Sequence, residues 1–181
     1  TLILILGAMS VAAYYVGRGR SIALAGGPKF GTTLHSLPGY YGYFTAIWCL
    51  LPALAILLLW LMIEPRVIVA LVIQGLPEAQ QSLSSGEIDL LVNNIQNLAA
   101  GDAVSGDIDA MLSDAAARLD EYRILSRRIL TVLTLGLGGL GGAIAWRRIH
   151  PDLRARNRVE KIILLMLIGA SSIAIFTTIG I

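Results

Sequence analysis

Side chains able to do chemistry are few in this sequence, and most of them are carboxylates. Ten of the twelve acidic residues lie between Glu64 and Glu121. Four aspartates of this stretch are close enough in sequence to suggest a cation site: Asp102, Asp107, Asp109 and Asp114. They lack the alternation and the terminal glutamate of a calcium-binding loop. The pattern therefore favours a solvated acidic face over a cation site.

Histidine and cysteine provide no recognisable site. Cys49 is the single cysteine, so the chain can form neither an internal disulfide nor a cysteine metal site. His35 and His150 have no metal-ligand spacing, and we expect them in solvated or interfacial positions. No serine, cysteine or carboxylate arrangement for catalysis falls in a predicted pocket. We therefore predict a protein that is not an enzyme, with no catalytic residue, no metal and no cofactor.

The composition is that of a membrane protein. Of the 181 residues, 56% are hydrophobic and only 14% are charged, whereas soluble domains have roughly a quarter of their residues charged. Four uncharged runs are candidate spans: 1–17, 44–63, 129–146 and 162–181. About 20 helical residues cross the hydrocarbon core, so the first run is the least secure span. Because basic residues follow it, we expect an uncleaved helix and not a signal peptide.

The charges between these runs predict a topology. Segments 18–41 and 147–161 carry net charges of +3 and +4, whereas 64–128 carries −5. By the positive-inside rule the basic segments are cytoplasmic, and the acidic segment and the N-terminus lie outside. We therefore predict two membrane segments of two helices each, 1–63 and 129–181, flanking an external loop.

The sequence of the acidic loop predicts helices. Glu64-Pro65-Arg66 is expected to end the second span. The apolar residues 67–73, too few to cross a membrane, are expected to lie at the interface or to pack under the loop. Ser84 and Glu87 have the spacing of a capping box. The helix that they begin has an apolar stripe and meets a natural stop at Gly101. The stripe consists of Ile88, Leu91, Val92, Ile95, Leu98 and Ala99.

A second amphipathic helix is predicted from about Asp107. Its stripe consists of Ile108, Met111, Leu112, Ala115, Leu119 and Tyr122. No proline separates it from run 129–146, so it is expected to continue into the membrane. The two stripes together predict an external helical hairpin between the second and third spans. The fold class is therefore all-α and integral to the membrane.

Two further patterns suggest contacts. In run 129–146, Gly138 with Gly142 forms GxxxG, and Gly139 with Ala143 repeats the spacing, so these four residues are candidates for close helix packing. The aromatic residues Tyr40, Tyr41, Tyr43, Phe44 and Trp48 are interpreted as a belt at the headgroup boundary.

The linker 147–161 contains the candidates for binding lipid headgroups. These are Arg147, Arg148, Arg154, Arg156 and Arg158. The alternative is that these charges serve only to set the topology, and this is the interpretation that we favour. The spans hold no ionisable residue apart from Cys49, Tyr14 and Tyr15, which argues against a pump or channel core formed by this chain alone.

Two stretches carry a family resemblance. Residues 34–43 (LHSLPGYYGY) resemble a segment near the N-terminus of long phosphate ABC-transporter permeases of the PstC type. Residues 154–161 (RARNRVEK) and the run after them are similar to the entry to the first core helix of that permease. The order of the elements between these stretches also matches. It is a hydrophobic helix, Glu64-Pro65-Arg66, an acidic helical loop with 97–101 (NLAAG) and a further helix.

The resemblance implies a subunit of a phosphate importer in a bacterial inner membrane, with its N-terminus in the periplasm. A second permease subunit, a dimeric cytoplasmic ATPase and a periplasmic phosphate-binding protein are the implied partners, and no nucleic acid is expected. The chain ends at Ile181, where the first core helix would be. No residue that contacts phosphate or the ATPase can therefore be carried over. The expectation is an N-terminal region truncated at that helix, and the alternative is a stand-alone accessory subunit of a larger complex.

Overall fold

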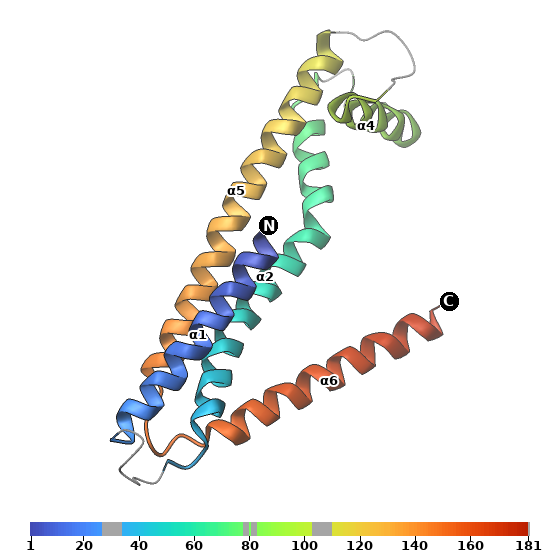
Figure 1. Ribbon diagram of the computed structural model, residues 1–181. Helices are drawn as coiled ribbons and strands as arrows, with labels where there is room; N and C mark the ends of the chain where they lie inside the picture. Colours follow the sequence, from blue (N-terminus) through green and yellow to red (C-terminus); the bar gives the residue numbers. More distant parts are fainter. Residues whose placement is uncertain (27–33, 78–79, 81–82, 103–109, 181) are drawn as a thin grey trace. The chain divides into compact units, whose positions relative to one another are not determined.

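The structure, a computed structural model, describes residues 1–26, 34–77, 80, 83–102 and 110–180. Every regular element in these residues is a helix (Figure 1). The helices are α1 (Leu2–Leu24), α2 (Pro38–Gln74), α4 (Ser85–Ala100), α5 (Ala110–Arg147) and α6 (Ala155–Ile179). All except α4 are long and apolar enough to cross a membrane. The predicted all-α class with four candidate spans is confirmed.

The described helices divide into two compact units. The first consists of Thr1–Ala55 and Thr134–Ile181, and the second is Ile56–Leu133. Helices α2 and α5 therefore contribute one part to each unit. α1 and α6 belong to the first unit, and α4 belongs to the second.

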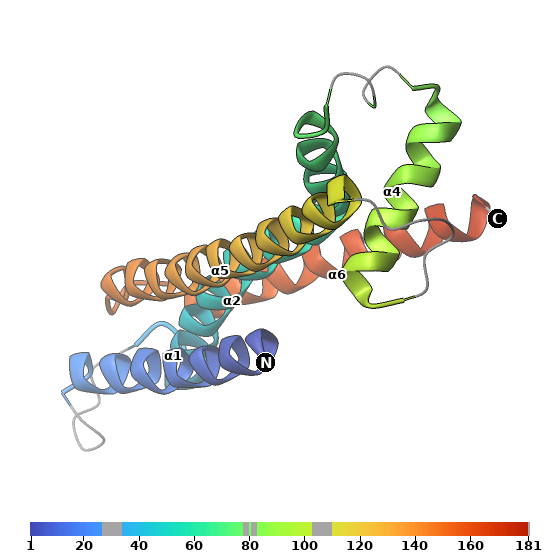
Figure 2. The ribbon, with the colours of Figure 1, turned by 90° about the horizontal axis from the view of Figure 1, so that it is seen from above.

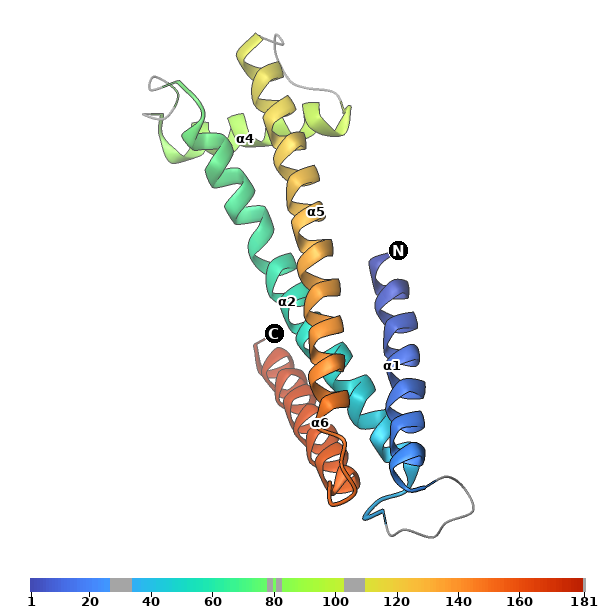
Figure 3. The ribbon, with the colours of Figure 1, turned by 90° about the vertical axis from the view of Figure 1, so that its left-hand side faces the viewer.

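In the first unit, α1 lies beside the start of α2 and the end of α5 (Figure 3). At 23 residues α1 is six residues longer than the apolar run that predicted it, and about 1.5 Å of rise per residue makes it long enough for the roughly 30 Å core. The extension includes Arg18 and Arg20, whose long side chains can reach polar surroundings from an apolar helix.

A buried cluster joins α2, α5 and α6 within the first unit. It consists of Tyr41, Phe44, Ala145, Ile149, Leu153, Ala155 and Val159. Two of the five residues assigned to an aromatic belt, Tyr41 and Phe44, thus lie in the protein core, while Tyr43 and Trp48 are exposed. The belt assignment is wrong for the buried pair, because the helical phase of α2 turns them toward the segment after α5.

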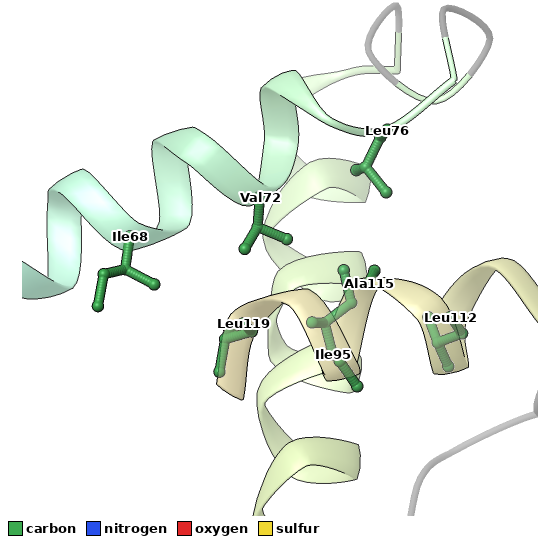
Figure 4. Close-up of a cluster of buried hydrophobic side chains, with 8 residues drawn as sticks. Ile68, Val72, Leu76, Ile95, Leu112, Ala115 and Leu119 are labelled. Carbon is green, nitrogen blue, oxygen red and sulfur yellow. The ribbon is translucent and has the colours of Figure 1, made fainter. Parts of the chain in front are cut away.

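In the second unit, α4 lies beside the end of α2 and the start of α5 (Figure 2). Their shared core contains Ile68, Val72, Leu76, Ile95, Leu112, Ala115, Ala116 and Leu119 (Figure 4). The apolar stripes of the two predicted amphipathic helices therefore meet. Ile68 and Val72 of α2 complete this core, in agreement with the predicted alternative that residues 67–73 pack under the loop.

One predicted boundary differs from the structure. Glu64-Pro65-Arg66 does not end the second span, because α2 continues through it to Gln74. An interior proline costs about 3 kcal/mol. Burial of Ile68 and Val72 in the shared core offsets this, at about 1.5–3 kcal/mol for each large aliphatic side chain. Segment 67–73 is thus helical, with Ile68 and Val72 packed in a core, which agrees with packing under the loop and not with the interfacial alternative.

The helix signals in the loop are otherwise observed. The Ser84 backbone N–H and hydroxyl both donate to Glu87 Oε2, at 3.0 and 2.7 Å, which confirms the capping box. At the other end Gly101 has a φ of 79°, and the N–H of Asp102 donates to the carbonyl of Asn97 at 2.9 Å. This is the glycine-terminated stop that the sequence predicted.

Helix α5 runs without a break from Ala110 to Arg147, as predicted from the absence of proline. The predicted start near Asp107, together with Asp109 and Ile108, lies outside the described residues.

Candidate functional site

The glycines of α5 mark where this helix comes closest to α2. A Cβ added at Gly141 would overlap the backbone carbonyl of Trp48, and one at Gly138 would lie 3.2 Å from the carbonyl of Cys49. A Cβ at Gly142 would lie 3.5 Å from the Cys49 Cβ, whereas one at Gly139 would meet nothing within 4 Å. The closest approach is therefore at Gly141, which neither predicted small-residue pair contains.

Gly139 and Ala143 line a groove between α1, α2 and α5. The groove has a volume of about 410 Å³ and is also lined by Met9, Ala13 and Cys49. Gly138 and Gly142 line it as well. The structure thus places all four predicted packing residues around one apolar groove, with two of them in direct contact with α2.

A second close helix contact, between α1 and α2, was missed by the sequence analysis. A Cβ at Gly17 would overlap the Thr45 hydroxyl and would lie 2.9 Å from the carbonyl of Tyr41. A Cβ at Gly42 would lie 2.6 Å from the Tyr14 ring. Gly17 has small-xxx-small spacing with Ala13 and Ser21, and Gly42 has it with Ala46, so the signal that could have found this contact was present in both helices.

Hydrogen bonds from α2 and from the residues before it hold the segment between α5 and α6. The buried Tyr41 hydroxyl contacts the carbonyls of Leu153, at 2.9 Å, and Pro151, at 3.3 Å. The backbone N–H of His35 donates to the carbonyl of Pro151 at 3.4 Å. These contacts connect the first stretch that carried the family resemblance, 34–43, to residues directly before the second, 154–161.

The five candidate headgroup arginines are all exposed. Arg156 has protein partners: its Nε donates to Glu160 at 2.6 Å, and its guanidinium lies 6.0 Å from the centre of the Tyr40 ring. Its backbone N–H donates to the Ser36 hydroxyl at 3.2 Å. Arg147, Arg148, Arg154 and Arg158 have no side-chain hydrogen bond or ion pair with the described residues.

The remaining candidates for chemistry are dispersed. Asp102 and Asp114 are exposed, and Asp107 and Asp109 lie outside the described residues. Within the described part of the chain no three His, Cys, Asp or Glu side chains gather closely enough to hold a metal ion. Cys49 is buried on α2 as a free thiol. The arrangement offers helix-packing surfaces and exposed cations, and the described residues offer no assembled reaction centre.

The family comparison accounts for the order of these elements. A family model described as phosphate ATP-binding cassette transporter matches residues 3–177, from α1 into α6. No curated protein and no solved structure matches the chain. Because the matched range covers almost the entire sequence, this membrane protein belongs to the phosphate ATP-binding cassette transporter family.

Proposed function

We propose that the chain is the N-terminal membrane region of a permease subunit in a phosphate importer, and that its role is scaffolding or assembly. The family match over residues 3–177 is the observation that carries this proposal. The absence of charged residues from the predicted spans supports a scaffold without a phosphate path of its own.

Helix α6 is the part of the chain best suited to meet another membrane subunit. Its buried residues are Ala155 and Val159, at its start, while Leu164, Ile168 and Phe176 are 57%, 54% and 75% exposed. Its most apolar 18-residue window has no buried residue. An apolar helix held only at one end leaves its length free for lipid or a second permease subunit.

The proposed topology follows from the charge distribution. The N-terminus and residues 64–128 lie in the periplasm of a bacterial inner membrane, and 18–41 and 147–161 lie in the cytoplasm. A reporter fused after Gly101 tests this arrangement. Periplasmic activity of the reporter is expected, and cytoplasmic activity contradicts the topology.

The implied partners are a second permease subunit, the cytoplasmic ATPase and the periplasmic phosphate-binding protein. Affinity purification of the tagged chain from its native membrane, followed by mass spectrometry, tests the assignment. Recovery of the ATPase and second permease is expected. Recovery of an unrelated large complex supports the alternative, a stand-alone accessory subunit. A reading frame that continues for a further ~200–300 residues of apolar segments, an ordinary domain length, excludes that alternative.

The acidic face is proposed to keep phosphate away from the external loop. Neutralising Asp102, Asp107, Asp109 and Asp114 to asparagine is therefore expected to leave substrate capture unchanged or improved. Weaker phosphate uptake through impaired capture contradicts this role.

A further inference from the structure

Two arginines on α5, Arg123 and Arg127, line a pocket in the second unit and have no side-chain hydrogen bond or ion pair with the described residues. The pocket has a volume of about 150 Å³, and α2, α4 and α5 contribute to it. Its polar lining is Glu64, Gln96, Arg123 and Arg127, and its apolar lining includes Ile68 and Leu119. Figure 4 shows Ile68 and Leu119 at one end of the buried core of this unit.

Arg123 and Arg127 differ from their neighbour Arg118, which has a hydrogen-bond partner. Arg118 donates to the carbonyl of Gly75 at 2.9 Å. Among the described residues, neither Arg123 nor Arg127 has a side-chain hydrogen bond, and the one ion pair found there joins Arg156 and Glu160. Two guanidinium groups one helical turn apart thus face a concave site with their donors unused.

The carboxylate in the pocket has other partners. Glu64 Oε1 accepts a hydrogen bond from the Ser126 hydroxyl at 2.5 Å, and Trp60 Nε1 donates to the same Ser126 oxygen at 2.9 Å. Glu64 therefore does not pair with either arginine, but its charge still lowers the formal charge of the pocket to +1. A singly charged anion fits this balance better than a doubly charged one.

The surroundings indicate where such an anion comes from. On α2 and α5, large apolar side chains within a few residues of the lining residues in sequence are exposed: Leu61, Met62, Ile124, Leu125 and Ile129. Trp60 has the amphipathic ring typical of a membrane–water boundary. Exposed apolar residues next to unpaired arginines match the two chemistries of a phospholipid, acyl chains and phosphate.

We propose that Arg123 and Arg127 form a phosphate-group site, and that the headgroup of a phospholipid supplies the phosphate. A guanidinium can bind two phosphate oxygens at once, which lysine cannot reproduce. The amide of Gln96, on α4, would then connect α4 to the bound headgroup. This site is separate from the candidate arginines of segment 147–161, and it does not depend on the transport assignment.

The test uses the full chain purified in detergent, with phosphatidylglycerol as one probe and inorganic phosphate as the other. Native mass spectrometry counts the phosphatidylglycerol that remains bound, and calorimetry measures inorganic phosphate. The variants are R123Q/R127Q and, as a control, R128Q, which removes one positive charge from an exposed neighbour that does not line the pocket. We expect R123Q/R127Q to lower phosphatidylglycerol affinity at least tenfold and R128Q to change it less than twofold.

Each outcome has a defined meaning. Binding of inorganic phosphate that depends on Arg123 and Arg127, with no specific retention of phosphatidylglycerol, supports the phosphate-group site and overturns the lipid source. If neither probe binds, the proposal of a site is overturned. An equal loss in R128Q also overturns it, because general charge attraction would then suffice. If R123Q/R127Q loses its helical circular-dichroism signal, R123K/R127K replaces it: a partial loss is expected, and unchanged binding contradicts guanidinium recognition.

Discussion

Helices α2 and α5 meet in both units of the molecule, but with different residues at the contact. In the first unit the backbones approach so closely that a Cβ at Gly141 would overlap the Trp48 carbonyl. In the second unit the contact is made by aliphatic side chains such as Val72 and Leu119, and Ile95 of α4 belongs to the same core.

This difference follows the solvents that the two contacts are expected to face. Lipid tails are as apolar as leucine, so helices in a bilayer gain little from burying aliphatic side chains and associate by close backbone approach. In water, removing aliphatic surface from solvent is the dominant favourable term. The comparison therefore supports a first unit in the membrane and a second unit with a part outside it. The predictions below test each side of this comparison.

The largest effect is expected at Ile95, which is fully buried in the second unit. I95A should lower the free energy that protects α4 against local opening by about 3 kcal/mol, because it removes buried aliphatic volume and leaves a cavity. Amide hydrogen exchange of α4 in the detergent-solubilised chain measures this. The control L90A, on the same helix at a residue 67% exposed, should change protection little. Equal effects of the two variants would show that α4 does not depend on this core.

A smaller loss of stability is expected from a substitution of Gly141 in the first unit. G141L should lower the free energy of unfolding in detergent by about 2 kcal/mol, because the added side chain forces α2 and α5 apart. The control is G136L, since a Cβ at Gly136 meets nothing within 4 Å. Unfolding followed by circular dichroism separates them. If G136L is as damaging as G141L, helix propensity or solubility and not backbone contact determines the result.

The contact between Tyr41 and the segment before α6 should contribute still less to the free energy of unfolding. Y41F removes a buried hydroxyl that bonds the Leu153 carbonyl at 2.9 Å, and we expect a loss of about 1 kcal/mol. Y43F, at a tyrosine 54% exposed, is the control. Increased protease cleavage in segment 147–161 of Y41F alone is the expected readout. Equal cleavage in both variants would contradict a role for this hydroxyl in holding the segment.

The smallest effect is a pH dependence of α4. The hydrogen bonds from Ser84 hold the pKa of Glu87 below its ordinary value of 4.5. A lowered pKa means that the carboxylate stabilises the helix start at a pH above the unfolded-state pKa, and that this stabilisation is lost as the pH falls through the folded-state value. The nuclear magnetic resonance shifts of residues 85–88 should report fraying there. E87Q should abolish this pH dependence, and its persistence would assign the transition to another group.

Much of the fold was predictable because it depends on local patterns. Apolar runs of 18–20 residues identified three of the long helices, and the spacing of Ser84 and Glu87 placed the start of α4 at the correct residue. The prediction failed at Pro65, where local propensity disagreed with tertiary burial. It also failed for Tyr41, because amphipathic aromatic side chains suit a membrane boundary and a protein core equally well.

The candidate sites were less predictable than the helices. GxxxG spacing indicated the correct helix, but the helical phase relative to α2 made Gly141 the closest residue. Ser126 pairs with Glu64, which lies 62 positions away in the sequence. The pocket brings Arg123 and Arg127, which have no partner among the described residues, to the same Glu64, 59 and 63 positions away. No spacing within one element signals such contacts.

The sequence by itself determined the helical class, the four apolar spans, the ends of α4 and the charge asymmetry between segments. These depend on composition and on contacts between residues a few positions apart, which the chain carries in any conformation. Only the tertiary structure decided which glycines touch a backbone, which aromatic residues are buried and which arginines lack a partner. Those properties depend on the rotation and depth at which one helix meets another, and these are set by side chains distant in sequence.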